Sequence, residues 1–268
     1  MIEMVEELRI TCKYYRKIRG DGNCYYRSVA YHILEKMLLH KGIAKEIQIW
    51  LNNQVTIPTS FFYNFDTNII KFSQGYTKVI NITPSMKIIN QLLDKVCEWS
   101  ELEEKSMAID NLIAILNEED NAFDKVFILL LRYGMMNMLI RYAYIQEFKI
   151  NGKPLNYSLQ VDMVNYKNDL GAIILNELMV MGKDARDWMI ELLPSLIGSK
   201  VTVCFLKADE KSYKEITFIP FLYEEDNMLH KAFREENFYI LLKPGHYDML
   251  YSHKEIKAYK CLDNVGIK

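Results

Sequence analysis

A cysteine near the start of the chain lies between a glycine-rich segment and an apolar pattern of helical spacing. The segment reads Arg-Gly-Asp-Gly-Asn-Cys and ends at Cys24. Apolar residues follow at the spacing of a helix face, at Val29, Ile33, Leu34, Met37 and Leu38. Because the first N–H groups of a helix are unpaired and the helix dipole is positive there, we expect the Cys24 thiol to lose its proton easily. The thiolate is the nucleophilic form, so the pattern predicts nucleophilic chemistry at Cys24.

A histidine and an acid near the other end supply the groups that such a nucleophile needs. The segment Pro-Gly-His-Tyr-Asp carries His246, with Asp248 two residues further on. An imidazole can take the proton of a thiol and an acid can orient the imidazole, so the three groups are the parts of a cysteine hydrolase. His253 is the competing histidine, and we prefer His246 because Gly245 precedes it and an acid follows it two residues on.

The elements that must position these groups are helices in the front part of the chain and strands in the back part. Periodicity predicts helices at residues 2–8, 24–39, 43–51, 84–116, 123–148, 170–179 and 185–197. Alternation and β-branched residues predict strands at 200–206, 215–219, 237–242 and 247–251. Residues 52–82 are predicted to be mostly loop with some helix. Since Cys24 comes from the helical part and His246 from the strand part, we expect one α/β domain rather than two.

Size, composition and charge are those of an ordinary globular protein. The chain has 268 residues, of which 50% are hydrophobic and 25% are charged, with a formal net charge of -2. Lysines and arginines are scattered, so nucleic acid is not an expected partner. The first residues are acidic and lead into no apolar run, so no signal peptide is expected. No run of about 18 apolar residues predicts a membrane span.

The cysteine content favours a reducing compartment. The five cysteines are Cys12, Cys24, Cys97, Cys204 and Cys261. Their number is odd and no two are spaced as CxxC, which argues against a disulfide scaffold and a zinc site. We expect Cys97 and Cys204 to be inert core residues, and Cys12 and Cys261 to be surface or edge residues without a role.

Two segments resemble the motifs of a known family. Residues 20–28, Gly-Asp-Gly-Asn-Cys-Tyr-Tyr-Arg-Ser, resemble the nucleophile motif of the ovarian-tumour (OTU) cysteine peptidases. Residues 245–251, Gly-His-Tyr-Asp-Met-Leu-Tyr, resemble their histidine motif. The length, the helical middle and the His-Tyr-Asp spacing are most similar to the otubain branch, peptidase family C65, whose members are deubiquitinases. Three positions depart from the residues that otubains usually have without removing a reactive atom: Gly20, Tyr25 and Ser28.

The resemblance implies a role for each matching residue. Cys24 would attack the carbonyl of the peptide or isopeptide bond at the ubiquitin C-terminus, His246 would transfer the proton, and Asp248 would orient the imidazole. Backbone N–H groups of residues 21–24 would form an oxyanion hole. Asp21 is included in the catalytic motif as a residue that shapes this loop. The substrate-binding positions that the resemblance implies are Gly22, Asn23 and Gly245.

The resemblance also implies the fold. We expect a papain-like cysteine peptidase fold of the α/β (α+β) class, with a small mixed or antiparallel sheet packed between helices. The sheet would come mainly from the C-terminal third and pack against the helix that starts at Cys24. A single catalytic domain over residues 1–268 is expected, with a helical arm of about residues 86–197 beside the site.

The implied activity is hydrolysis of isopeptide bonds at the C-terminus of ubiquitin, in polyubiquitin or ubiquitinated proteins, without metal or cofactor. Two alternatives stay open: a non-catalytic regulator that binds ubiquitin or a ubiquitin-conjugating enzyme, and a peptidase for a ubiquitin-like modifier. The segment of residues 61–65 is expected in the core, with contact to ubiquitin as the alternative. We expect a cytoplasmic monomer, with the nucleus as a second location; delivery into a host cell as an effector is also compatible with the sequence.

Overall fold

The computed structural model describes residues 2–39, 42–54, 63–64, 69–71, 77–79, 83–118, 123–145, 148–150, 152–206, 213–221, 227–253 and 255. The side chains of the aromatic segment at residues 61–65 lie outside the described part of the chain, as does Cys261.

Helices dominate the first two hundred residues and strands dominate residues 200–252, as the sequence pattern predicts. The helices are α1 (Ile2–Thr11), α2 (Cys24–Leu39), α3 (Ile43–Gln54), α4 (Thr83–Ser100), α5 (Lys105–Asn117), α6 (Phe123–Tyr142), α7 (Leu155–Ser158), α8 (Gln160–Asn165), α9 (Leu170–Ile173), the π-helix η1 (Ile174–Leu178), α10 (Asp187–Ile197) and α11 (Met228–Phe233). The strands are β1 (Cys12–Arg16), β2 (Tyr63–Asn64), β3 (Ile69–Lys71), β4 (Thr77–Val79), β5 (Lys149–Ile150), β6 (Lys153–Pro154), β7 (Lys200–Phe205), β8 (Lys214–Phe218), β9 (Asn237–Lys243) and β10 (His246–Ser252).

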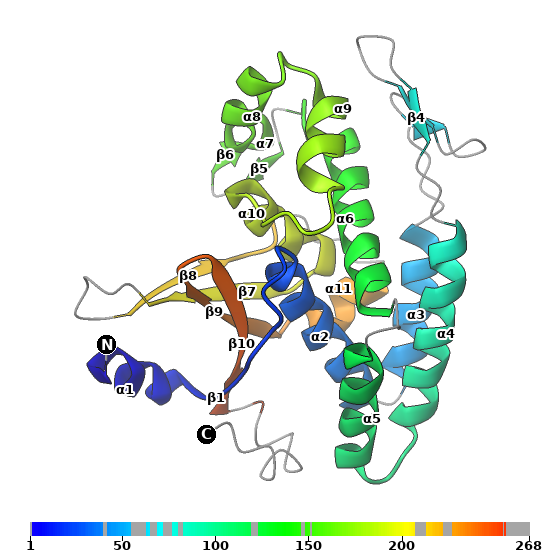
Figure 1. Cartoon of the computed structure of the whole chain (residues 1–268), viewed down its shortest axis with the longest axis vertical. Coiled ribbons are helices and arrows are strands. Elements are labelled where there is room, and N and C mark those ends of the chain that lie inside the picture. The colour runs from blue at the N-terminus through cyan, green and yellow to red at the C-terminus, as the bar shows by residue number, and fades with distance from the viewer. Residues whose placement is uncertain are drawn as a thin grey trace.

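The C-terminal strands β7 to β10 and the N-terminal strand β1 form a five-stranded sheet in the order β1-β10-β9-β7-β8 (Figure 1). Strands β7 and β9 run parallel and the other neighbours run antiparallel, so the sheet is mixed. Strands β9 and β10 form a tight hairpin in which His246 pairs with Lys243. Gly245 has φ +70° in the turn, a conformation that glycine adopts without steric cost. The hairpin therefore presents His246 at its very tip.

The alternation along the strands divides the sheet into two faces. Apolar side chains of one face join the main core with α2, among them those of Val201, Val203, Phe238, Ile240, Met249 and Tyr251. The neighbouring positions Cys204, Leu241 and Leu250 point to the other face, where Cys12 and Leu8 of α1 complete a small second cluster. Successive side chains of a strand point to opposite faces, so this division follows directly from the sequence.

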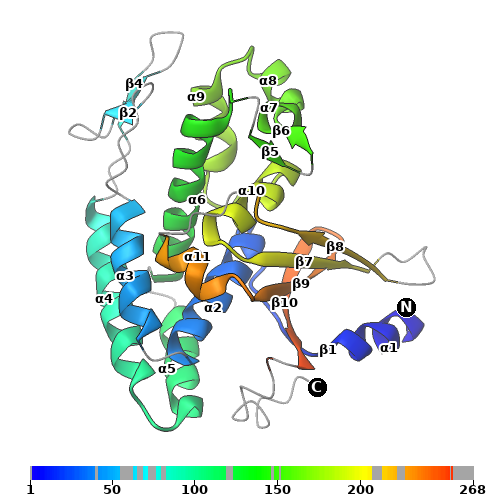
Figure 2. The same cartoon turned by 180° about the vertical axis from the view of Figure 1, so that it is seen from behind.

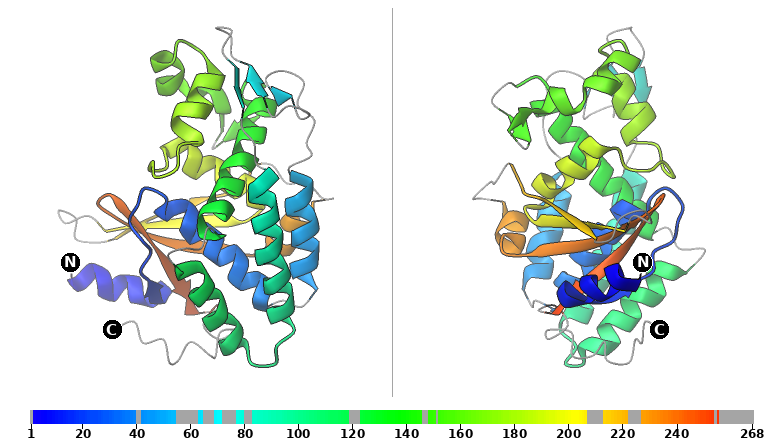
Figure 3. Two further views of the ribbon diagram at one scale, coloured as in Figure 1. Left: turned by 45° about the vertical axis from the view of Figure 1, so that its right-hand side comes forward. Right: turned by 90° about the vertical axis from the view of Figure 1, so that its left-hand side faces the viewer.

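Helix α2 is the centre of the molecule. Every residue from Cys24 to Leu38 is buried. The helix packs on β9 and β10 on one side and on α3, α4, α5 and α6 on the others, and Figure 3 shows it enclosed between sheet and helices. Several of its buried polar groups are paired, for example Lys36 Nζ with Glu236 Oε2 at 2.7 Å. A helix surrounded in this way has little freedom to shift, which fixes the place of its first residue, Cys24.

Helices α7 to α9 lie beside the upper end of α6, over α10 (Figure 2). Helix α6 approaches α10 closely at Gly134, where an added Cβ would lie 2.9 Å from Leu196 Cδ1. Gly198 ends α10 with φ +70°. The contact between Gly134 and Leu196 joins the upper helices to the core around α2. It also fixes the path of the segment between η1 and α10, residues 179–186, which we call the facing loop.

Several elements differ from the sequence-based expectation. Strand β1 and helix α11 were not expected: β1 is a short edge strand with charged residues, and α11 is a single short helix capped by Asn227 Oδ1. Residues 52–54 belong to α3, in line with the expected mixture of loop and some helix, whereas the short strands β2 to β4 within residues 63–79 are not expected from the sequence. The helix predicted at 170–179 is a short α-helix continued by the π-helix η1, a local widening that periodicity does not distinguish.

Candidate active site

Cys24 is the first residue of α2, and Asn23 precedes it at the N-cap position. The Asn23 carbonyl accepts the first helical hydrogen bond, from the Arg27 N–H, at 2.9 Å. Cys24 itself is only 2% exposed. The helix therefore begins where the glycine-rich segment predicts, and the thiol sits at its N-terminal end.

His246 and Asp248 form a hydrogen-bonded pair at the start of β10. Nε2 of His246 lies 2.8 Å from Oδ1 of Asp248, while Nδ1 is the ring nitrogen on the other side. The Asp248 side chain is completely buried, whereas 22% of the His246 side chain is exposed. Side chains two residues apart on a strand point to the same face, so the spacing in the sequence produces this pair directly. A buried acid thus orients an imidazole that a substrate can reach.

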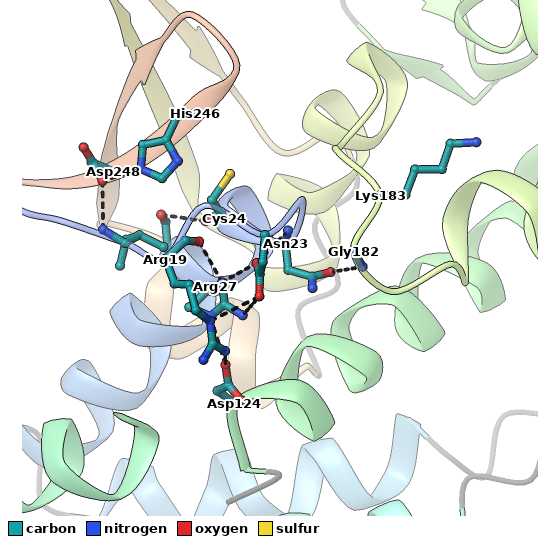
Figure 4. Close-up of polar contacts among 12 residues, drawn as sticks. Arg19, Asn23, Cys24, Arg27, Asp124, Gly182, Lys183, His246 and Asp248 are labelled. Atoms are coloured by element: carbon teal, nitrogen blue, oxygen red, sulfur yellow. Dashed lines mark hydrogen bonds and ion pairs between the residues drawn. The ribbon is translucent and has the colours of Figure 1, made fainter. Parts of the chain in front are cut away.

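The fold brings Cys24 to this pair. The backbone N–H of Tyr247, the residue after His246, hydrogen-bonds to the Cys24 thiol. Gly20 lies against the imidazole, because a Cβ on Gly20 would be 3.2 Å from His246 Nδ1. Figure 4 shows the Cys24 sulfur on the side of the imidazole away from Asp248. Cys24, His246 and Asp248 therefore lie in one row, in the order that proton transfer requires.

His253 lies elsewhere. It is at the opposite end of β10, where its Nε2 is 3.2 Å from the Arg9 carbonyl oxygen. Glu255 follows His253 at the same spacing as Asp248 follows His246, so an acid two residues on does not distinguish the two histidines. The Glu255 carboxylate accepts hydrogen bonds from the Ser252 N–H and hydroxyl. The structure therefore brings His246 and not His253 to the thiol.

The Asp248 carboxylate has three partners: His246, the backbone of Ile18, and Lys243. Besides His246, Oδ1 accepts the Ile18 N–H at 2.8 Å, and Oδ2 lies 2.5 Å from Lys243 Nζ. Burial raises the pKa of Asp248, but the contacts with Lys243, Ile18 and His246 outweigh burial, so the pKa lies below its usual value. Asp248 is therefore held as a carboxylate.

A buried arginine clamps the loop before the nucleophile, residues 19–23, which we call the nucleophile loop. Arg27 donates from Nη1 and Nη2 to the two oxygens of Asp21, each at 2.7 Å. Arg27 Nε donates to Asp124 Oδ2 at 3.0 Å, and Arg27 Nη1 also donates to the Arg19 carbonyl. Burial opposes the charge of Asp21, but the hydrogen bonds from Arg27 lower the pKa of Asp21 to about 2. Asp21 Oδ1 also accepts the Asn23 N–H at 3.1 Å, so Asp21 shapes the loop and does not face the thiol.

A second buried arginine ties the nucleophile loop to the facing loop. Asn23 Oδ1 accepts from Arg132 Nη2 and from the Gly182 N–H, both at 3.0 Å. A Cβ on Gly22 would lie 2.0 Å from the Gly182 carbonyl oxygen, so the two backbones are in direct contact. The side chain of Asn23 therefore points into the protein, away from Cys24, and only its backbone borders the site (Figure 4).

Comparison with known proteins identifies the family to which the chain belongs. The model of the family described as Peptidase C65 Otubain matches residues 1–252. The chain is an otubain. Otubains are cysteine deubiquitinases, which places the chain among ubiquitin-related hydrolases and confirms the resemblance seen in the two motifs.

Individual relatives are distant. The human protein named ubiquitin thioesterase OTUB1 is 22% identical over 250 residues, which are 93% of this chain and 74% of that protein. A structure of ceOTUB1 with ubiquitin aldehyde and UBC13~Ub is 20% identical, with a TM-score of 0.56 over 94% of this chain and 84% of the other. A structure of h/ceOTUB1 with ubiquitin aldehyde and UBCH5B~Ub is 20% identical, with a TM-score of 0.55 over 94% and 81%. These likenesses confirm the predicted papain-like fold class with its small mixed sheet.

The expectation of an easily ionised thiol is wrong for this otubain. Burial raises the pKa of Cys24 above its ordinary value, and the nearby Asp184 carboxylate acts in the same direction. Hydrogen bonds from the backbone N–H groups of Tyr247 and Tyr25 oppose this rise without cancelling it. A helix terminus alone favours the thiolate, but packing of the loops around the sulfur removes the water that would stabilise its charge.

A cavity opens next to the histidine strand of the otubain. It has a volume of about 370 Å³ and lies between α10 and the sheet, with Tyr247 in its wall. Its remaining lining residues are Asp187, Ile190, Glu191, Val203, Phe205, Ile216, Phe218 and Leu242. The walls are therefore mainly apolar, with two carboxylates on the side of α10.

Cys12 lies in edge strand β1, one of the two expected placements, and it is buried under α1 in the small second cluster. Cys204 is buried in the core as predicted.

Within the described residues, no group of three or more His, Cys, Asp or Glu side chains is arranged to hold a metal ion. In the same part of the chain, no helix combines the length and the apolar character that crossing a bilayer requires.

The sequence did not reveal the residues that fix the nucleophile loop and the Asp248 carboxylate in this otubain. The most important are Arg27, Asp124, Arg132 and Lys243. Arg132 left a signal, because it is a lone charge within a run of apolar residues in α6. Asp124 and Lys243 left none, since an acid at a helix start and a lysine before a turn are common on protein surfaces.

Proposed function

We propose that this otubain is a cysteine-type deubiquitinase that hydrolyses isopeptide bonds at the C-terminus of ubiquitin. The observation that carries the proposal is the row formed by Cys24, His246 and Asp248, whose members come from opposite ends of the chain. A free cysteine with a structural role does not need an oriented imidazole beside it, because packing alone would retain it. Family membership supplies ubiquitin as the substrate class.

In the first step His246 Nδ1 takes the thiol proton as Cys24 Sγ attacks the carbonyl carbon of the last residue of ubiquitin. The attack breaks the carbonyl π bond and places a negative charge on its oxygen. The carbonyl then reforms, the bond to the lysine nitrogen breaks, and the imidazolium returns its proton to the leaving amine. The product is a thioester between Cys24 and ubiquitin. Asp248, held as a carboxylate, stabilises the imidazolium during both transfers.

In the second step water replaces the amine. His246 takes a proton from the water, the hydroxide attacks the thioester carbonyl, and the Cys24 sulfur leaves and recovers a proton from the imidazolium. The negative oxygen of each intermediate needs N–H donors. The Asn23 N–H is already bonded to Asp21 Oδ1, so we assign the donor role to the N–H groups of Gly22 and Cys24.

The cavity beside Tyr247 supports binding of an extended tail. Its apolar floor suits aliphatic side chains, and the carboxylates of Asp187 and Glu191 suit basic ones. At the hairpin tip, a Cβ on Gly245 would meet nothing within 4 Å, which leaves space for a slim chain over His246. The tail of ubiquitin ends in two glycines and fits such an approach.

The test is reaction with a ubiquitin probe that carries a C-terminal electrophile, together with cleavage of di-ubiquitin. The parent chain should be labelled at one site, Cys24, as identified by mass spectrometry. Cys24→Ala should abolish both labelling and cleavage, and His246→Ala should reduce both by a large factor. Cys97→Ala is the matched control and should behave as the parent. Cleavage by Cys24→Ala at the parent rate would refute the mechanism.

A second function is suggested by the related structures, which hold OTUB1 together with ubiquitin-charged conjugating enzymes. In this alternative the chain binds such an enzyme and blocks it without catalysis. Cys24→Ala separates the two functions, since it would retain inhibition of a conjugating enzyme while losing cleavage. Probes made from ubiquitin-like modifiers test the remaining alternative, a peptidase for such a modifier.

We further propose that the chain acts as a monomeric, single-domain enzyme in a reducing compartment, the cytoplasm or the nucleus. Its thiol chemistry requires a reduced Cys24, and thiols stay reduced in these compartments. Size-exclusion chromatography with light scattering tests the monomer, and imaging of the tagged chain in its own cells tests the location.

A further inference from the structure

Arg132 is a charged residue in a place where a charge is costly. It lies in α6 among residues that are nearly all apolar, and it is completely buried. Burial lowers the pKa of Arg132 below its ordinary value. Within the described part of the chain its hydrogen bonds go to three neutral oxygens, so none of these acceptors is a carboxylate that would offset the cost of burial. Packing alone would be served better by an apolar side chain.

The hydrogen bonds of Arg132 reach both loops that border the site. Nη1 donates to the carbonyl of Leu178, the residue just before the facing loop, at 2.6 Å, and Nη2 donates to the carbonyl of Lys183 within that loop at 2.8 Å. Nη2 also donates to Asn23 Oδ1 at 3.0 Å, which lies in the nucleophile loop. One rigid, planar group thus joins two irregular segments that are far apart in the sequence.

Asn23 completes the link from the other side. Its Oδ1 accepts from Arg132 and from the Gly182 N–H, so it is shared between α6 and the facing loop. Asn23 lies directly between Gly22 and Cys24, whose N–H groups we assign to the oxyanion hole. A movement of the Asn23 side chain would therefore change the direction of those N–H groups.

The guanidinium also packs on the helix that carries the nucleophile. Its Cζ lies 3.9 Å from the centre of the Tyr26 ring, in cation–π geometry. Tyr26 is in the first turn of α2, two residues after Cys24. Arg132 thus contacts the nucleophile loop, the first turn of α2 and the facing loop at once.

We propose that Arg132 is a positioning residue that sets the oxyanion hole, acting through Asn23 and the facing loop without touching the substrate. The proposal rests on the proposed hydrolase function. Its consequence is specific: loss of Arg132 weakens stabilisation of the transition state, while binding of ubiquitin, which depends on surfaces away from these N–H groups, stays nearly the same.

Steady-state hydrolysis of a fluorogenic C-terminal ubiquitin amide tests this. Arg132→Met should lower kcat about 10- to 100-fold with less than about a threefold change in KM, because a displacement of about 1 Å at the reacting groups has an effect of this size. Arg132→Lys keeps the charge but loses the planar fork, and its kcat should lie between those of Arg132→Met and the parent. Asn23→Ala should lower kcat similarly, and the double variant Arg132→Met with Asn23→Ala should lose little more than either single variant.

Met135→Ala is the matched control, because Met135 is equally buried on α6, one turn further on. It should lower the melting temperature and leave kcat of the folded protein unchanged. The proposal is overturned if Arg132→Lys and Asn23→Ala both keep kcat within about twofold of the parent, or if Met135→Ala lowers kcat as much as they do. Arg132→Lys and Asn23→Ala are milder changes, so they keep the test valid if Arg132→Met does not fold.

Hydrogen exchange of the Gly182 amide gives a readout independent of catalysis. It should exchange at least about tenfold faster in Arg132→Lys than in the parent, whereas amides in the middle of β9 should not change. Unchanged exchange at Gly182 would contradict the link between the loops. If the parent chain fails to react with ubiquitin, the proposed function fails, and the exchange result still decides whether Arg132 joins the two loops.

Discussion

The two segments that supply the reactive groups are held in different ways. The nucleophile loop has no regular structure and is fixed by side chains, chiefly those of Arg27 and Arg132, which are 2% and 0% exposed. The tip of the β9–β10 hairpin, with His246 at its end, is fixed by the backbone ladder of two strands. A charged residue also holds it: Lys243, whose side chain is 39% exposed, lies against Asp248.

The difference has a physical reason. In a hairpin, backbone N–H and C=O groups pair with the neighbouring strand, and the pleat decides where each side chain points. An irregular loop leaves these groups without such partners, so side chains from other elements must satisfy and hold them. The loop therefore depends on buried residues distributed over α2, α6 and the facing loop, whereas the hairpin depends mainly on local sequence.

The largest effect is expected from Gly22→Ala. Gly22 has φ +74°, and its added Cβ would lie 2.0 Å from the Gly182 carbonyl oxygen, so the two loops must separate. The oxyanion donors move with them, and kcat for ubiquitin amide hydrolysis should fall about 100-fold or more.

Gly152→Ala is the control for backbone strain in this comparison. Gly152 has φ +78° but a Cβ there would meet nothing within 4 Å. The control should lose about 1–2 kcal/mol of stability, as alanine does at positive φ, with kcat unchanged. If Gly22→Ala does no more harm to kcat than Gly152→Ala, the contact between the loops is not needed for catalysis.

An intermediate effect is expected from Asp248→Asn on the hairpin side. The amide N–H₂ of an asparagine would face either Lys243 Nζ or the ring N–H of His246, so two hydrogen-bond donors would oppose each other. The neutral amide would also fail to stabilise the charge of an imidazolium. We expect kcat to fall roughly 10- to 100-fold while the melting temperature changes little, because the ladder still holds the hairpin.

Lys243→Met sharpens this result. It removes a half-exposed partner of Asp248 and leaves the Ile18 N–H and the His246 contact in place. Its kcat should fall by less than about fivefold, as expected for a partly solvated ion pair. A loss as large as that of Asp248→Asn would show that the hairpin depends on buried charges as strongly as the nucleophile loop does.

The smallest effect is a pH dependence of stability caused by Asp21. Its folded-state pKa of about 2 lies below the ordinary value of 3.8, so its contribution is complete above about pH 4 and is lost as the pH falls toward 2. Asp21→Asn should unfold at lower urea concentration than the parent at pH 6, and this difference should shrink between pH 4 and pH 2. Equal differences at pH 6 and pH 2 would show that the clamp by Arg27 does not depend on the Asp21 charge.

The sequence allowed much of this site to be predicted. Cys24 was placed at the start of a helix because glycines and asparagine precede an apolar pattern, and α2 begins at that residue. The sequence predicts Asp248 as the acid that orients His246 because it follows two residues further on, and the hydrogen bond between them is present. The pKa of the thiol was predicted in the wrong direction, since desolvation depends on which segments cover the sulfur.

What the sequence determined by itself is local: where α2 begins, which faces of the late strands are buried, and that an acid accompanies a histidine. These follow from periodicity and from backbone preferences of single residues, which act over a few positions. What only the tertiary structure decided is the set of contacts between distant segments, namely Arg27 with Asp124, Arg132 with Asn23 and Lys183, and Gly22 with Gly182. Such contacts arise from packing three-dimensional surfaces against one another, and no short stretch of sequence specifies them.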